Sequence, residues 1–101
     1  MNIGDRDLSL PGVTMLDRSI CSRIARIRYP DLDFDTAWRL AHAHDARTLT
    51  VMADEADCTA AALYEQADDE EGANRRNTLA SAGSHASRAT ALRAAADFLT
   101  F

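Results

Sequence analysis

The stretch TLTVMADEADCTAAALYEQA, residues 48–67, decides how the fold is interpreted from the sequence. In its first half, apolar residues recur at helical spacing and form a stripe of Leu49, Met52, Ala53 and Ala56. Asp57 and Cys58 then interrupt the pattern and are interpreted as a turn. Thr59 can cap a second helix that continues to Gly72. The stretch therefore predicts two short helices joined by a tight turn.

Two further helices are predicted before this stretch. The first begins at Thr14 and ends before Pro30, because proline disfavours the helical conformation of the residue preceding it. Its expected buried stripe consists of Leu16, Ile20, Ile24 and Ile27. The second helix takes Asp33 or Asp35 as its N-cap. Trp38, the only tryptophan in a chain with few bulky side chains, is the expected anchor of the core.

The segment that follows is less regular. Residues 72–85 are predicted to be a short helix flanked by loops or a flexible connection. Residues 88–101 are predicted to form a last helix, with Arg93 and Asp97 paired four positions apart. Its inward face is expected to consist of Leu92, Ala95, Ala96 and Leu99. Residues 1–13 have little periodicity and are interpreted as an irregular lead-in.

No segment has the alternating β-branched pattern of a strand, so the sequence predicts an all-α protein. We expect a compact bundle of about five short helices in one domain, residues 14–101. Of the 101 residues, 20 are Ala, against ten Leu, four Ile and two Val. Such a thin core favours closely packed helices, and it makes a homodimer or another partner surface more probable than in a leucine-rich domain.

Several positions within residues 48–67 fit a known motif: a small residue at Ala53, buried residues at Met52 and Ala56, a cap at Thr59, and the pair Leu63 and Tyr64. These positions resemble the helix-turn-helix of TetR-like bacterial transcriptional regulators. The resemblance covers about twenty residues and implies a helix pair of the kind that binds DNA. The turn departs from the family, which usually has Gly followed by Val where this chain has Asp57 and Cys58.

The predicted second helix has the wrong chemistry for reading DNA. A recognition helix uses Arg, Asn, Gln or Lys on bases, and basic groups on phosphates supply most of the affinity. Its exposed positions here are expected to be Ala60, Ala61, Glu65, Gln66, Asp68 and Asp69. Carboxylates placed against phosphates would oppose binding. Three interpretations remain open: ordinary core architecture, an acidic protein-binding face, or DNA binding through arginines elsewhere.

Charge is segregated along the chain. Residues 48–71 contain eight acids and no arginine, so they carry −8, and the rest of the chain carries +3, which gives the net charge of −5. We expect a protein-binding surface formed by Asp54, Glu55, Glu65, Asp68, Asp69, Glu70 and Glu71. The favoured function is a small regulator or inhibitor, of a type encoded by phages or mobile elements, whose acidic face competes for a basic nucleic-acid-binding surface on a protein partner. An acidic face that serves only solubility is the simpler alternative.

Two other classes of function remain open. One is a DNA-binding transcriptional regulator that holds phosphates with Arg23, Arg26, Arg75 and Arg76, and a continuous basic stripe through these residues would favour it. The other is a helical structural subunit or chaperone of a larger assembly, in which the last helix packs on a neighbouring protein.

Residues that could support catalysis or metal binding are sparse. His42 and His44 would point about 200° apart on a helix and cannot share one metal ion, and His85 lies in a serine-rich segment. Cys21 and Cys58 lack a CxxC spacing and are expected to be small core residues in a reducing cytoplasm. The sequence contains no phosphate-binding glycine loop, no metal or cofactor motif and no membrane-spanning apolar run. A non-enzymatic cytoplasmic protein without cofactors is expected.

Overall fold

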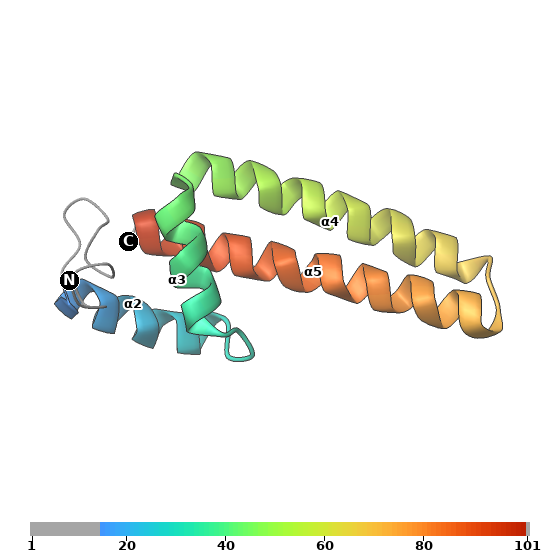
Figure 1. Cartoon of the computed structure of the whole chain (residues 1–101), viewed down its shortest axis with the longest axis horizontal. Helices are drawn as coiled ribbons and strands as arrows, with labels where there is room; N and C mark the ends of the chain where they lie inside the picture. The colour runs from blue at the N-terminus through green and yellow to red at the C-terminus, as the bar shows by residue number, and fades with distance from the viewer. Residues whose placement is uncertain (1–14, 101) are drawn as a thin grey trace.

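The computed structural model describes residues 15–100, which form four helices and no strand (Figure 1). The helices are α2 (Met15–Arg28), α3 (Phe34–Ala43), α4 (Ala46–Asp68) and α5 (Gly72–Thr100). The prediction of an all-α fold is confirmed. The predicted lead-in at residues 1–13 and the predicted cap at Thr14 lie outside the described residues.

The two long helices, α4 and α5, form an antiparallel hairpin that gives the molecule its elongated shape (Figure 1). α3 crosses the C-terminal part of α5, and α2 lies at the same end of the hairpin. The principal extents are 51 × 27 × 22 Å. We call the end with α2 and α3 the proximal end. Residues 56–89, which include the turn between the two long helices, are called the distal hairpin.

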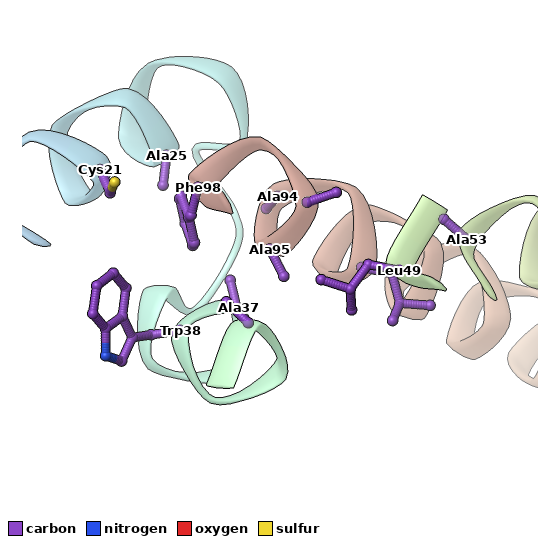
Figure 2. Packing of buried hydrophobic residues seen from close by; sticks show 12 residues of the cluster. Cys21, Ala25, Ala37, Trp38, Leu49, Ala53, Ala94, Ala95 and Phe98 are labelled. Atoms are coloured by element: carbon purple, nitrogen blue, oxygen red, sulfur yellow. The ribbon is translucent and has the colours of Figure 1, made fainter. Parts of the chain in front are cut away.

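The bulky core residues are concentrated at the proximal end. The ring centroids of Phe34, Trp38 and Phe98 lie 5.1, 5.6 and 6.3 Å apart in pairs. Trp38 is only 3% exposed, which confirms its predicted role as the core anchor. Leu49 of α4 and Leu92 of α5 are the largest fully buried side chains and continue this core into the hairpin. Figure 2 shows Leu49 at this place. Four helices therefore meet at one aromatic cluster.

α2 packs on this core through a different face from the one predicted. Cys21 and Ala25 are buried against the cluster, so the expectation of a small core residue at Cys21 is confirmed (Figure 2). The predicted isoleucine stripe is wrong for Ile27, which is 76% exposed. The other described members of that stripe, only partly buried, are Ile20 and Ile24. Tertiary packing overrides the periodicity here, because the small residues allow α2 to approach the aromatic rings closely.

The distal hairpin is held together by small side chains. Its buried residues are Ala56, Ala60, Ala67, Thr78, Ala82 and Ala89. The main core cluster extends only to Ala53 on α4 and Leu92 on α5. A buried methyl or methylene group contributes about 0.8 kcal/mol, so an alanine interface stabilises far less than one made of leucines. The distal hairpin is consequently a two-helix structure with little core of its own.

Aspartates cap the helices at both proximal connections. Asp33 accepts hydrogen bonds from the backbone N–H of Asp35 (3.2 Å) and from the Thr36 hydroxyl (2.9 Å), which confirms the predicted cap. Asp45 accepts from the backbone N–H of Thr48 at 2.7 Å and caps α4. This hydrogen bond to the backbone holds the pKa of Asp45 below its ordinary value of 3.8. Both caps fix the directions in which α3 and α4 leave their connections.

The turn predicted at Asp57 and Cys58 is wrong, because α4 continues through both residues. The helix-turn-helix pair expected over residues 48–67 is therefore not formed. The segment has no glycine or proline to end a helix, and it is rich in alanine, the strongest helix former. Thr59 does not act as a cap either, since its hydroxyl donates to the carbonyl of Glu55 one turn earlier (3.0 Å). Cys58 is exposed rather than a core residue.

α5 is also longer than predicted. Residues 72–85 are helical throughout, so neither a flexible connection nor a flanking loop is present there. Gly72 has a φ of 61° at the reversal between α4 and α5, a backbone conformation that glycine adopts at little cost. Thr78 and Ala82 are buried against α4 and hold the start of α5 in place. Residues 15–100 thus contain four helices instead of the predicted five.

The uneven core leads to a testable prediction for stability. Replacing Leu92→Ala should lower the free energy of unfolding by about 2 to 5 kcal/mol, because it leaves a cavity in the proximal core. Leu79→Ala is the matched control on the same helix, since Leu79 is 37% exposed; it should change stability by less than about 1 kcal/mol. Urea unfolding followed by Trp38 fluorescence measures both variants. Equal losses in the two would contradict a core concentrated at the proximal end.

Candidate functional site

The seven acidic residues expected to form one surface lie in two separate places. Five of them surround the turn of the hairpin: Glu65, Asp68, Asp69, Glu70 and Glu71. Asp54 and Glu55 lie on the same helix at least ten residues earlier. At 1.5 Å per residue, this places them roughly 15 Å from the nearest acid of the turn. The structure therefore groups the five acids, which we call the acidic tip, and separates the other two from them.

The acidic tip is shaped by the end of α4. Asp69 is the C-cap, and its backbone N–H donates to the carbonyls of Gln66 and Ala67. The Gln66 side chain donates to the Glu70 carboxylate at 3.2 Å. Acids at positions 69 to 71 also lie just before the positive end of the α5 dipole, which favours them. The turn is thus defined by local hydrogen bonds that leave most of its carboxylates facing solvent.

The five carboxylates of the acidic tip are not engaged in ion pairs among the described residues. Arg75 and Arg76 follow in the first turns of α5 and are exposed. The field of such a cluster extends about 8 Å at physiological salt before it is screened. The tip therefore presents a concentrated negative charge at one pole of an elongated molecule.

Two large hydrophobic side chains are exposed near the tip. Tyr64 is 45% exposed and Leu79 is 37% exposed. Tyr64 lies two helical turns after Asp57, and Leu79 lies four turns before Arg93. Because Asp57 and Arg93 form an ion pair on one flank of the hairpin, both hydrophobic side chains belong to that same flank. Helical periodicity does not predict this exposure, because it cannot show that only two helices pack here.

Asp54 has an intramolecular partner. Arg93 of α5 donates from Nη2 to Asp54 Oδ1 at 2.9 Å, and its Nη1 lies 2.5 Å from Asp57 Oδ2. Burial alone would lower the pKa of Arg93, but the carboxylates of Asp57 and Asp54 outweigh this effect and the pKa is raised. Partly exposed pairs of this kind contribute about 0 to 1 kcal/mol each. Asp54 therefore fastens the two long helices together, and it is a weaker candidate for binding a partner.

Asp97 also has partners other than the one predicted. Instead of pairing with Arg93 along α5, it accepts from Arg28 at 3.1 Å and from the Tyr29 hydroxyl at 2.8 Å. These contacts join the end of α2 to the last turns of α5. The predicted pair between Arg93 and Asp97 is wrong because each residue has a closer partner on another helix.

The arginines proposed for nucleic-acid binding do not form a continuous stripe. Arg23 and Arg26 lie on α2 at the proximal end, whereas Arg75 and Arg76 adjoin the acidic tip. Arg28 fixes the end of α2 beside Asp97, which is 22 residues from Arg75 along α5. At 1.5 Å per residue that separation is roughly 33 Å. Each pair of arginines therefore belongs to a different pole of the molecule.

The part of the chain that the structure describes shows no metal-binding cluster, since no group of three His, Cys, Asp or Glu side chains there could hold a metal ion. His42 lies edge-on to Trp38, with the ring centroids 5.6 Å apart, and serves packing. None of the helices between residues 15 and 100 has the length and hydrophobicity of a bilayer-spanning segment.

The Tyr29 contact predicts a specific pH dependence. Burial raises the pKa of the Tyr29 phenol above its ordinary value of 10.0, and the hydrogen bond to Asp97 raises it further. The stabilisation from Tyr29 should be complete below pH 10 and disappear as the pH rises through the raised value. Ultraviolet absorbance of tyrosinate should show a late phase that Tyr29→Phe removes and Tyr64→Phe retains. A late phase that survives in Tyr29→Phe would rule out this assignment.

Comparison of the chain with protein-family models, curated proteins and solved structures finds no match.

Proposed function

We propose that this chain is a non-enzymatic protein-binding module, a regulator or inhibitor, that docks its distal hairpin on a basic surface of a protein partner. One observation carries the proposal: the distal hairpin is only two helices thick, yet it exposes Tyr64 and Leu79 beside five carboxylates. Exposed apolar side chains bordered by charge are typical of binding surfaces.

The two kinds of side chain have different tasks in such a complex. Tyr64 and Leu79 supply apolar area, and tyrosine is favoured at interfaces because its ring buries much surface at a small cost in side-chain entropy. The carboxylates of the acidic tip attract a basic partner and accelerate the encounter. A partner packed on the hairpin would also supply the core that the alanine interface lacks.

The nature of the partner follows from the charge. A surface that receives five carboxylates has to be basic, and basic grooves are common on proteins that bind nucleic acids. Occupation of such a groove by the acidic tip would exclude its nucleic acid, which is how an inhibitor of this design would act. DNA binding by this chain is disfavoured by the separation of its arginines. A structural subunit of an assembly would also use the exposed hairpin, but its binding would depend little on salt.

The first experiment identifies the partner at the hairpin. A photoreactive benzoylphenylalanine is placed at Tyr64, or at Arg39 on the exposed side of α3 as a control, in cells that naturally contain the chain. A single protein cross-linked from position 64 and absent from position 39 is the expected result. Identical products at both positions, or none from position 64, would contradict the proposal.

The acidic tip gives the quantitative prediction. The double variant Asp68→Asn, Glu71→Gln should slow association with the cross-linked partner about three- to tenfold at low salt and weaken the salt dependence of the rate. The control variant Asp31→Asn, Glu55→Gln changes the net charge equally but lies away from the tip. Stopped-flow or surface-based kinetics compare the two. An equal effect of both variants would show that overall charge, and not the tip, governs the encounter.

A further inference from the structure

A pocket at the proximal end gathers arginines and hydroxyl groups. It has a volume of about 380 Å³ and lies between α2 and the start of α3. Its lining residues are Arg18, Ser19, Ser22, Arg23, Arg26 and Phe34. Two serine hydroxyls and three guanidinium groups therefore border one space, and none of the described lining residues carries a carboxylate.

Arg18 forms a fixed wall of this pocket. Its Nη2 donates to Asp35 Oδ1 at 3.0 Å, and its side chain is only 21% exposed. The guanidinium carbon lies 4.9 Å from the ring centroids of both Phe34 and Trp38. Stacking on two aromatic faces and pairing with a carboxylate hold the group in one orientation. Its charge is also largely balanced by Asp35.

The remaining charge of the pocket is not balanced. Ser19, Ser22, Arg23 and Arg26 are spaced at three, four and seven residues, so they share one face of α2. Arg23 and Arg26 form no ion pair with any of the described carboxylates. Two adjacent guanidinium groups on one helix repel each other unless an anion lies between them. The pocket therefore has two uncompensated positive charges next to two neutral hydrogen-bond donors.

We propose that this pocket binds the phosphate group of a small phosphorylated molecule. A phosphate monoester carries a charge of about −1.5 to −2 at neutral pH and three acceptor oxygens, which matches two guanidinium groups assisted by hydroxyls. A carboxylate would leave one arginine unbalanced. The Phe34 ring offers an apolar wall on which the organic part of the ligand packs.

A nucleic-acid backbone fits the pocket less well. Duplex binding normally neutralises several phosphates in a row, about six to ten in well-studied cases. The pocket offers two unpaired arginines, and Arg75 and Arg76 lie at the opposite pole. The phosphate site is also distinct from the distal hairpin, so it does not depend on the proposed function, and each can fail alone.

The test uses the full chain and defined probes. Phenyl phosphate is titrated and followed by calorimetry and by amide chemical shifts, with inorganic phosphate, benzoate and a short DNA duplex in parallel. We expect phenyl phosphate to bind more tightly than inorganic phosphate or benzoate, with the largest shifts at residues 18–26 and at Phe34. No saturable binding of phenyl phosphate at millimolar concentration would overturn the proposal.

Two charge-matched variants locate the site. Arg23→Gln, Arg26→Gln should weaken phenyl phosphate binding at least tenfold, whereas Arg75→Gln, Arg76→Gln should leave it unchanged. Circular dichroism melting verifies that both variants are folded, as expected for exposed positions. Equal weakening in both variants would reveal attraction by overall charge and reject the pocket. DNA that binds more tightly than phenyl phosphate and is lost only in the α2 variant would assign the arginines to a nucleic-acid surface instead.

Discussion

The contact on which the rest of the structure depends is the cluster of Phe34, Trp38 and Phe98. It joins two aromatic residues of α3 to the end of α5, which lies far from α3 in the sequence. The rings of Phe34 and Trp38 also support the guanidinium of Arg18 and so position α2. The chain has 20 alanines, and within residues 18–100 no other place has enough bulk to fix four helices relative to one another. The phosphate pocket borders this cluster, so its geometry depends on the aromatic packing.

The alanine content of the hairpin determines how closely its helices pack and how much apolar area they bury. Small side chains let α4 and α5 approach closely along the distal hairpin, but they bury little apolar area. The pairs of Arg93 with Asp54 and Asp57 fasten the hairpin where the main core ends. Beyond that point Tyr64 and Leu79 remain exposed because there is no third helix to cover them. The small side chains that make the hairpin less stable therefore also leave the apolar residues on its flank exposed.

Local chemistry predicted much of the fold. The cap at Asp33 follows from its side chain and its position before a helix, and the burial of Trp38, Leu49 and Leu92 follows from their size and spacing. The predictions were wrong where contacts between residues far apart in the sequence determine the structure. Asp57 could end a helix when considered alone, but in the structure it pairs with Arg93 from another helix. No pattern near Asp57 could have revealed that partner.

The candidate sites were predictable only in part. The charge pattern identified the five carboxylates of the acidic tip, because they are consecutive or nearly so in the sequence. It could not separate Asp54 from them, since its engagement by Arg93 depends on how α5 returns along α4. The pocket on α2 could not be predicted from the sequence either. It forms only where Phe34 of α3 lies next to the face of α2 that carries Ser22 and Arg26. Sites formed by residues close together in the sequence can be predicted from it, and sites formed between helices cannot.

The alanine interface has a further consequence for motion. Opening of the hairpin near Gly72 disrupts only a few methyl contacts, whereas opening near Leu92 has to break the whole aromatic core. Local unfolding should therefore begin at the turn and become steadily more costly toward the proximal end. Amide hydrogens along α4 and α5 would exchange with solvent in a gradient, fastest beside the acidic tip. The part of the hairpin that opens most easily is therefore also the part that carries the proposed binding surface.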